Sequence, residues 1–221
     1  MDLILTHEQA DFDAMASMMA VAHLRDTLIP VLPYHMNRNV RKFINLYGAE
    51  LPFVEARDLP TEKVDSIILV DTQALVTLKG VSSRTKVSVV DHHPLRSDIP
   101  PEWQTTIEKT GATTTILVNA IRDQNGHLSM IEATLLLLGI YEDTGSMTYA
   151  STTSADVKAV AYLMDHGANL KIAAEFLNPP LSNEQLKLSD RLLANMQNLT
   201  IHGKHIFISI ADAANMTEEV S

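Results

Sequence analysis

Six histidine and aspartate side chains are spaced along the sequence in a way that could hold metal ions. They are His7, Asp11, Asp13, Asp71, His92 and Asp143. Imidazole nitrogens and carboxylate oxygens together suit divalent ions such as Mn²⁺ or Mg²⁺. Two such ions about 3.5–4 Å apart, sharing a bridging carboxylate, polarise a phosphoryl group, generate hydroxide near neutral pH and stabilise the departing oxygen. This set of residues therefore predicts hydrolysis of a phosphoester or phosphoanhydride.

Each of these residues has a simpler structural explanation when it is considered alone. An aspartate at the start of a helix, such as Asp11 or Asp13, is typical of an N-cap. Asp71 follows a buried strand, where an aspartate often forms a turn with its own backbone. The adjacent His92 and His93 are harder to explain in this way, because two imidazoles at the end of a buried strand supply one metal ligand and one proton donor or phosphate contact. The joint occurrence of the motifs favours the metal site.

The apolar runs before these residues predict the strands that must position them. Runs rich in β-branched residues predict buried strands, and segments with helical spacing lie between and after them. The strands are predicted at residues 3–6, 66–70 and 87–90, with two further candidates at 29–33 and 53–55. The helices are predicted at residues 14–24, 40–47, 113–121 and 131–141. This alternation predicts an α/β fold with a parallel, Rossmann-like sheet covered by helices.

The titratable residues fall where such a sheet binds ligands. Ligands of parallel α/β sheets bind outside the carboxyl ends of the strands. His7, Asp71 and the triplet Asp91-His92-His93 each come just after a predicted strand. Three strands would therefore deliver histidine and aspartate side chains to one edge of the sheet.

Composition limits the classes of protein to which the chain can belong. With 221 residues, of which 46% are hydrophobic and 20% charged, it can bury a core. It has no cysteine, which excludes disulfides and thiolate metal sites. The formal net charge of -10 suits small phosphorylated ligands better than long duplex nucleic acid. Because the sequence has neither an apolar run of the roughly 20 residues that a membrane span needs nor a signal sequence, we expect a cytoplasmic protein without a membrane partner.

The last third of the sequence predicts a change of architecture. Helical patterns at residues 155–164 and 183–196 are separated by Asn178-Pro179-Pro180, and two short apolar runs flank the turn His202-Gly203-Lys204. The runs predict a hairpin, and a two-stranded hairpin cannot bury itself. We therefore expect a first domain at residues 1–155, a helical connector at 156–197 and, at 198–221, the start of a second subdomain that this chain does not complete.

Four motifs in order along the chain resemble those of the DHH family of phosphoesterases, over roughly residues 1–155. The motifs are His7 with Asp11-Phe12-Asp13, Asp71, Asp91-His92-His93, and Glu142-Asp143-Thr144-Gly145. The resemblance implies that one ion is held by His7, Asp11, Asp71 and Asp143, and the other by Asp13, Asp71, His92 and Asp143. It implies that Asp71 and Asp143 are shared by both ions. It also implies that His93 faces the substrate phosphate as donor or general acid, while Asp91 orients a histidine.

Two motifs narrow the resemblance within the family. The segment 142–149 followed by Thr152-Thr153 resembles the nano-RNase and RecJ-like exonuclease branch more than the manganese pyrophosphatases, which implies short oligonucleotides, cyclic dinucleotides or related small nucleotides as substrates. The first motif, Gln9-Ala10-Asp11-Phe12-Asp13-Ala14, departs from the common nano-RNase form. It resembles DHH modules at the head of bacterial proteins that carry CBS domains and a poly(A) polymerase or CCA-adding nucleotidyltransferase domain. We expect this chain to be such a module. The Gly-Gly-His motif of the family's second domain does not occur in the sequence.

Other interpretations remain open at this stage. The chain could be a manganese-dependent pyrophosphatase, or a regulatory module that binds nucleotide or metal to control an attached nucleotidyltransferase. A dinucleotide-binding oxidoreductase is disfavoured, because no Gly-x-Gly-x-x-Gly follows the first strand. The run Thr113-Thr114-Thr115 could contact phosphate, although a plain helix start is the favoured explanation. A homodimer is also compatible with the sequence.

Overall fold

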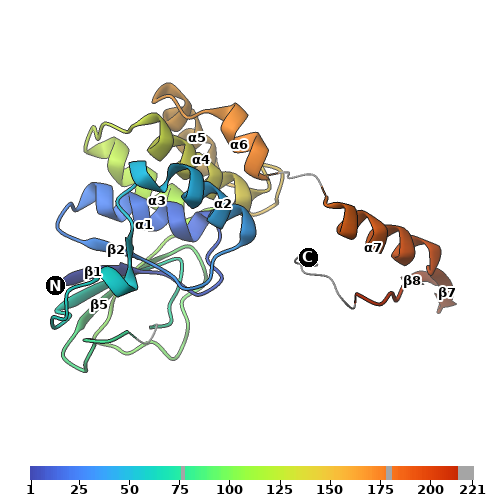
Figure 1. Cartoon of the computed structure of the whole chain (residues 1–221), viewed down its shortest axis with the longest axis horizontal. Helices are drawn as coiled ribbons and strands as arrows, with labels where there is room; N and C mark the ends of the chain where they lie inside the picture. Colours follow the sequence, from blue (N-terminus) through green and yellow to red (C-terminus); the bar gives the residue numbers. More distant parts are fainter. Residues whose placement is uncertain (76–77, 178–180, 214–221) are drawn as a thin grey trace. The chain divides into compact units, whose positions relative to one another are not determined.

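A six-stranded parallel sheet is the centre of the molecule's first unit. The computed structural model describes residues 1–75, 78–177 and 181–213, which divide into two compact units, Met1–Leu177 and Asn178–Ser221 (Figure 1). In the first unit the strand order is β3-β2-β1-β4-β5-β6, and every neighbouring pair is parallel. The strands are β1 (Asp2–Leu5), β2 (Ile29–Leu32), β3 (Val54–Glu55), β4 (Ser66–Val70), β5 (Lys86–Asp91) and β6 (Gln104–Ile107). The predicted α/β class with a parallel, Rossmann-like sheet is confirmed.

The direction in which strands are added reverses between β1 and β4. β2 and β3 follow β1 on one side, whereas β4, β5 and β6 lie on the other. Because the chain leaves β1 and β4 in opposite directions, a crevice is expected at their carboxyl ends. The two strands are tied there by the Thr6 hydroxyl, which donates to the carbonyl of Val70 at 2.9 Å. The topology therefore singles out this edge of the sheet as the place for a ligand.

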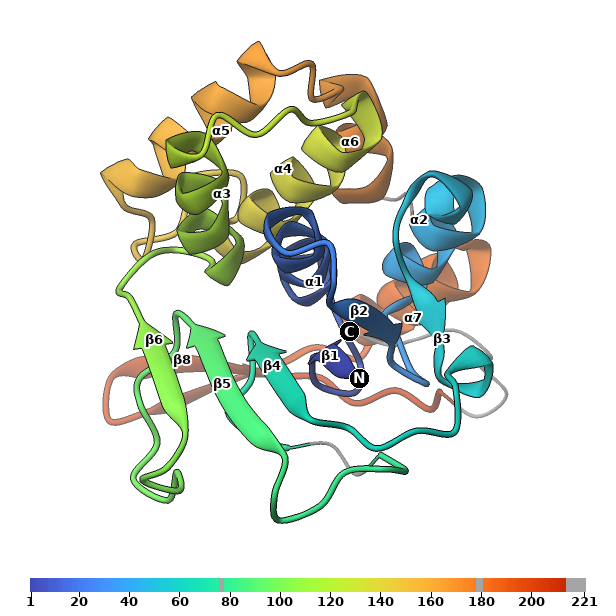
Figure 2. The ribbon, with the colours of Figure 1, turned by 90° about the vertical axis from the view of Figure 1, so that its left-hand side faces the viewer.

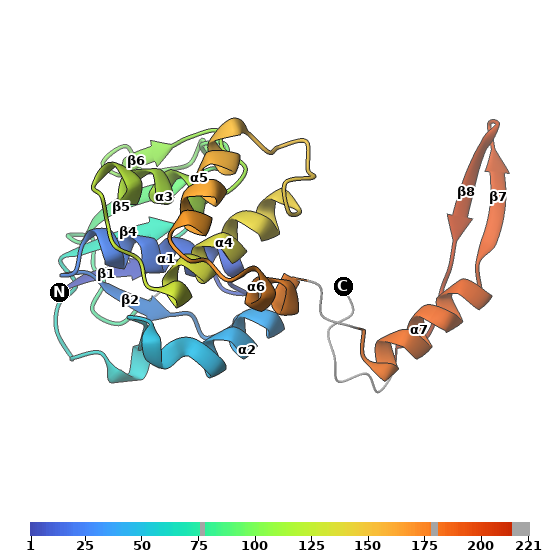
Figure 3. The ribbon, with the colours of Figure 1, turned by 90° about the horizontal axis from the view of Figure 1, so that it is seen from above.

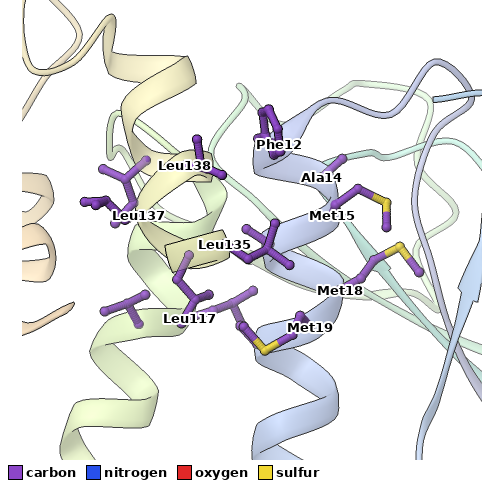
Figure 4. Packing of buried hydrophobic residues seen from close by; sticks show 14 of the residues in the cluster. Phe12, Ala14, Met15, Met18, Met19, Leu117, Leu135, Leu137 and Leu138 are labelled. Carbon is purple, nitrogen blue, oxygen red and sulfur yellow. The ribbon is translucent and has the colours of Figure 1, made fainter. Parts of the chain in front are cut away.

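Helices cover one face of the sheet (Figure 2). They are α1 (Phe12–Leu24), α2 (Arg38–Tyr47), α3 (Thr113–Asp123), α4 (Met130–Thr144), α5 (Ser154–Asp165) and α6 (Leu170–Leu177), and the short 3-10 helices Gly48–Glu50 and Ala56–Asp58 flank β3. α1 is buried from Phe12 to Ala22, because α3 and α4 also pack against it. Figure 4 shows Leu117 of α3 and Leu135 of α4 beside α1, within the main apolar core.

The opposite face of the sheet is covered mainly by the segments that connect the strands. Leu3, Leu69 and Val89 belong to a second buried apolar cluster on this face. Partly buried residues such as Leu59 and Trp103 pack against it from the connecting segments. Both faces of the sheet are thus shielded, as a parallel sheet requires.

The second unit is a helix followed by a hairpin (Figure 3). Helix α7 (Asn183–Ala194) begins with a capping box formed by Ser182 and Gln185. Strands β7 (Gln197–Ile201) and β8 (Lys204–Ile208) pair antiparallel, and the turn between them has positive φ at His202 and Gly203. The predicted hairpin is therefore present, and the side chains of both its strands are exposed.

Two elements of the first unit were not predicted, β6 and α6. β6 is an edge strand of sequence Gln-Thr-Thr-Ile whose side chains are mostly exposed, so no apolar run marks it. α6 is eight residues long and buries only Ala173 and Phe176. Phe176 packs at 6.1 Å from Phe12 and 5.1 Å from Phe43 between ring centroids.

The compact unit consequently extends to Leu177, whereas the expected domain boundary was at residue 155. Residues 156–177, expected in a connector, form most of α5 and all of α6 in the same unit as the sheet. The break at Asn178-Pro179-Pro180 and residues 214–221 of the expected second subdomain lie outside the described residues. The division into domains stays a prediction. Across the described ranges, the helices are all too short or too polar to span a membrane.

Candidate metal centre

Five segments bring the predicted residues to the carboxyl edge of the sheet. His7 follows β1, Asp71 directly follows β4, and His92 directly follows β5. α1 begins with Asp11 as its N-cap and carries Asp13 in its first turn, while α4 carries Asp143 in its last turn. Their side chains fall into groups whose ligand atoms lie within 4.8 Å of one another.

The first group contains His7, Asp11 and Asp71. His7 Nε2 lies 3.5 Å from Asp71 Oδ2, while its Nδ1 is 2.7 Å from the carbonyl oxygen of Glu8. If Nδ1 carries the proton and donates to that carbonyl, Nε2 presents its lone pair to the group, which is the usual arrangement of a metal-binding histidine. Asp71, the Glu8 carbonyl and Asp11 outweigh partial burial and raise the pKa of His7 to about 9.

The second group contains Asp13, His92 and Asp143. His92 Nδ1 lies 3.2 Å from the carbonyl oxygen of Thr110, so His92 also directs Nε2 into its group. That nitrogen lies 3.2 Å from Asp143 Oδ2 and 3.8 Å from Asp71 Oδ1. Burial disfavours the charged ring, but Asp143, the Thr110 carbonyl and Asp71 outweigh it and raise the pKa of His92 to about 9.

Asp71 lies between the two groups. It belongs to the first and also to a further group with Asp91, His92 and His93. Its Oδ1 accepts a hydrogen bond from the hydroxyl of Thr113 at 3.0 Å, and only 6% of its surface is exposed. This placement suits the shared ligand that a two-ion site needs. Asp143 falls in the second group alone, so its expected role as another shared ligand stays a prediction.

Asp91 contacts both His93 and Gln73. Its Oδ1 accepts from the backbone N–H of His93 at 3.0 Å and lies 2.8 Å from His93 Nδ1. Its Oδ2 accepts from the side-chain amide of Gln73 at 2.9 Å. The side chain of His93 is 56% exposed. With Nδ1 held by Asp91, His93 keeps Nε2 available for a substrate.

Asp11 and Asp13 both cap helices as well as joining the cluster. Asp11 caps its own helix α1 by accepting from the backbone N–H of Ala14 at 3.0 Å. Asp13 instead accepts from Thr113 and Thr114 at the start of α3. The run 113–115 is fully buried, so α3 begins there and these threonines cannot contact a phosphate in solvent.

Backbone strain is concentrated around the cluster. Six residues other than glycine have positive φ in the described ranges, and four of them belong to the loops that carry the cluster. They are Gln9 at 62°, Asp71 at 54°, Ser146 at 54° and Met147 at 72°. Left-handed backbone costs a non-glycine residue about 1–2 kcal/mol, and such strain tends to persist where a binding site requires it.

Sequence reasoning did not assign roles to Gln73, Glu142 or Asp156. Gln73 binds Asp91 and, through its side-chain oxygen, the backbone N–H of Arg96 at 2.8 Å. Glu142 accepts a hydrogen bond from the backbone N–H of Phe12 at 2.5 Å. Burial raises the pKa of Glu142 to about 7, and the nearby carboxylates add to this increase, although the hydrogen bond opposes it. These carboxylates are Asp11, Asp143 and Asp71. For Asp156 the sequence did contain a signal, since the Thr153-x-x-Asp156 spacing is that of a capping box.

The residues present suit a divalent cation. His92 Nε2 is buried and makes no hydrogen bond of regular geometry in the described part of the chain, although Asp143 Oδ2 lies 3.2 Å away. Burial, together with Asp71 and Asp143, raises the pKa of both Asp11 and Asp13, the latter strongly. Carboxylates held this close repel one another, and a bound cation removes that repulsion. The donor set contains oxygen and nitrogen only, as Mn²⁺ or Mg²⁺ would require.

The sequence matches the model of a known family. The family model described as "DHH family, N-terminal domain" matches residues 3–140, which is more than half of the chain. The chain belongs to this family.

The curated relatives include two kinds of protein. The A-adding tRNA nucleotidyltransferase of Geobacter sulfurreducens is 35% identical over 218 residues, which are 96% of this chain and 25% of that protein. The manganese-dependent inorganic pyrophosphatase of Bacillus subtilis is 25% identical over 169 residues, which are 74% of this chain and 54% of that protein. The chain thus spans about a quarter of the length of the first relative.

Two solved structures share the fold. An exopolyphosphatase-related protein from Bacteroides fragilis superposes with a TM-score of 0.69 at 19% identity, covering 89% of this chain and 61% of that one. A putative family II inorganic pyrophosphatase from Methanococcus jannaschii gives a TM-score of 0.65 at 22% identity, and the match covers 95% of this chain and 71% of that one. At these low sequence identities, the structural similarity establishes the fold alone.

Proposed function

We propose that this chain is a divalent-metal-dependent phosphodiesterase that hydrolyses short oligonucleotides or related nucleotides with two ions. The observation that carries the proposal is the convergence of the six predicted ligands into two neighbouring groups, because Asp71 of the first group lies 3.8 Å from His92 Nε2 of the second. His7, Asp11 and Asp71 would hold one ion, and Asp13, His92 and Asp143 the other, with Asp71 shared. Ions held by these residues would supply polarisation of the phosphoryl group and a lowered pKa of water.

The protein's own groups would bind and orient the substrate. His93 is exposed, and its Nδ1 is held by the buried Asp91, which fixes the ring and favours a proton on Nδ1. When the ring is protonated, Nε2 can donate to a phosphate oxygen or to the departing oxygen. Asp91 would act as a positioning residue and Gln73 would hold Asp91 in turn.

Turnover of a defined panel tests the proposal. The full chain is incubated with Mn²⁺ and a dinucleotide, a cyclic dinucleotide, a short RNA or pyrophosphate. We expect release of nucleoside monophosphate from the nucleotides, and a loss on the order of 100-fold or more in Asp71→Asn, which keeps the size of the side chain but not its charge. Asp123→Asn, at the far end of α3 and largely exposed, is the matched control and should keep full activity.

Pyrophosphate hydrolysis is a second candidate, favoured by the similarity to the pyrophosphatase of Bacillus subtilis. The same panel separates the two. Cleavage of pyrophosphate with none of the nucleotides, abolished by Asp71→Asn, would replace the phosphodiesterase assignment with this one.

A regulatory role beside a nucleotidyltransferase is the third candidate. It is favoured because the similarity to the A-adding tRNA nucleotidyltransferase covers 96% of the chain, including residues beyond the sheet domain. Metal binding without turnover of any substrate, both in this chain and in a longer protein that includes further domains, would support it against the hydrolase.

A further inference from the structure

Two tyrosines of the first unit are exposed at the edge of the sheet that carries the metal cluster. Tyr34 is 71% exposed and Tyr149 is 58% exposed. The other aromatic side chains of Met1–Leu177 are buried or partly buried. Tyr34 follows the carboxyl end of β2, and Tyr149 follows α4, whose last turn carries Asp143. An exposed aromatic ring beside a phosphate-binding site is a surface on which a nucleobase can stack.

The loop that carries Tyr149 is held firmly by Thr144. The Thr144 carbonyl accepts the backbone N–H groups of Thr148 and Tyr149, at 2.9 and 3.0 Å. Its side-chain oxygen accepts the N–H of Met147 at 3.2 Å. The carbonyl of Tyr149 accepts the N–H of Thr152 at 3.1 Å. Tyr149 is therefore fixed by its backbone while its side chain stays exposed, and Figure 3 shows this connection between α4 and α5 as a projecting loop.

The same loop contains three consecutive residues in the left-handed region. Gly145, Ser146 and Met147 have φ values of 53°, 54° and 72°. For the two residues other than glycine this conformation is costly, by about 1–2 kcal/mol each. The turn brings the Tyr149 ring against the Cα of Gly145, where a side-chain carbon at that glycine would lie 2.6 Å from Cδ1 of the ring. The strained turn thus holds the ring against Gly145, which is two residues after Asp143.

Neither burial in the core nor a hydrogen bond of its own hydroxyl accounts for the position of the Tyr149 ring. The ring is mostly exposed, and no hydrogen bond of its hydroxyl is found among the described residues. What the placement does provide is an exposed aromatic face that lies against Gly145, two residues after the candidate ligand Asp143. Exposed aromatic faces are surfaces on which bases stack.

We propose that Tyr149 forms a nucleobase-binding subsite, in which the base of the nucleotide whose phosphate lies at the metal cluster stacks on the ring. This inference rests on the proposed function and makes its substrate class more specific: the site selects nucleotides over phosphates that lack a base. Stacking needs the ring but not the hydroxyl. Phenylalanine at position 149 should therefore preserve binding of the base, and leucine should not.

Binding of two matched ligands tests the subsite without relying on turnover. The affinities of AMP and of ribose 5-phosphate are measured by calorimetry on the full chain with Mn²⁺, since ribose 5-phosphate carries an anomeric hydroxyl where AMP carries the base. We expect AMP to bind more tightly in the wild type. Tyr149→Leu should weaken AMP binding about 5- to 150-fold, the range measured for loss of one base stack, and Tyr149→Phe should restore it. Gly145→Ala, which displaces the ring, should also weaken it.

Tyr34→Leu is the matched control, because it removes an exposed tyrosine at the same edge of the sheet from a different loop. Equal AMP and ribose 5-phosphate affinities in the wild type would overturn the subsite and leave the phosphodiesterase proposal standing. Equal losses from Tyr34→Leu and Tyr149→Leu would overturn the assignment of the base to Tyr149. If the wild type binds no Mn²⁺, the proposed function fails, and the subsite fails with it.

Discussion

The carboxylate of Asp13 on α1 accepts the backbone N–H of Thr113 at the start of α3, 100 residues later in the chain, at 2.8 Å. Its other oxygen accepts the N–H of Thr114, also at 2.8 Å. Asp13 is fully buried and shares a group of potential ligands with His92 and Asp143. One side chain thus joins two helices and contributes to the metal centre, so a change at Asp13 should disturb both.

Replacing Asp13 by asparagine should loosen the start of α3. An amide has only one oxygen, so one of the two N–H groups that Asp13 accepts would face an NH₂ group. A buried donor left without a partner costs about 1–3 kcal/mol. We expect amide hydrogen exchange at Thr113 or Thr114 to accelerate about tenfold or more, together with weaker Mn²⁺ binding.

Asp11→Asn is the control for Asp13→Asn. Asp11 accepts a single N–H, that of Ala14, and asparagine is as good an N-cap as aspartate. This variant should lose Mn²⁺ affinity while exchange at the start of α3 stays as in the wild type. If both variants left α3 equally protected, the joining role of Asp13 would be wrong.

Metal binding should release protons near neutral pH. The pKa values of His7 and His92 are raised to about 9, so both rings are protonated in the metal-free protein at pH 7.5. An imidazole must be neutral at the nitrogen that binds a metal, so saturation should release at least about two protons per chain, and more if the raised pKa of Asp13 also leaves a proton to be displaced. Calorimetry with Mn²⁺ in buffers of different ionisation enthalpy measures the number. His92→Gln should reduce it by about one and the exposed His127→Gln should not; heat that is independent of the buffer would contradict the prediction.

The metal-free protein should lose stability as the pH rises. The folded-state pKa values of His7 and His92, about 9, lie above their ordinary value of 6.5, and that of Glu142, about 7, lies above 4.5. A group whose pKa is raised on folding stabilises the fold below its unfolded pKa, and this contribution disappears as the pH passes through the folded pKa. The Tm measured in EDTA should therefore fall from about pH 5 to pH 9, most steeply above pH 6.5. Saturating Mn²⁺ should flatten the slope; an unchanged slope would argue against the cluster as its source.

Loss of Gln73 should lower catalysis without removing the metals. Its side chain donates to Asp91 at 2.9 Å and accepts from the backbone of Arg96 at 2.8 Å, which holds His93 through Asp91. Removing such a partner typically costs 10- to 100-fold in activity. We expect Gln73→Ala to lower kcat about tenfold, to shift the pH profile of kcat, and to leave Mn²⁺ affinity within about twofold. A change in KM alone would point to a purely structural role.

Asp156 should be important for stability. Its carboxylate is fully buried and accepts from the backbone N–H of Gly111 at 3.0 Å, from the hydroxyl of Thr115 at 2.6 Å, and from the backbone N–H and hydroxyl of Thr153 at 2.6 and 2.7 Å. Asp156→Ala leaves these buried donors unpaired, so the free energy of unfolding measured in urea should fall by about 2–4 kcal/mol. Asp165→Ala, exposed at the end of the same helix, is the control and should change it by less than about 0.5 kcal/mol.

The strands that carry the cluster were predictable because they are buried on both faces. The segments 66–70 and 87–90 are short and mostly apolar, and each is followed directly by an aspartate, so both the strand and the position of the ligands after it can be read from the sequence. β6 could not be found in this way, since an edge strand has no need of apolar side chains. α6 was missed because only two of its residues are buried, so its helical pattern is short and weak.

The sequence by itself determined the class of fold, the family and the identity of the candidate ligands, because residue type and order along the chain are local information. Only the tertiary structure decided how those ligands are divided between groups, which residue lies between them and which side chains hold them in place. Asp13 caps a helix that begins 100 residues later, and Gln73 holds Asp91 from 18 residues away. Such contacts depend on how strands and helices pack, and side-chain spacing along the chain carries no information about distances across the sheet.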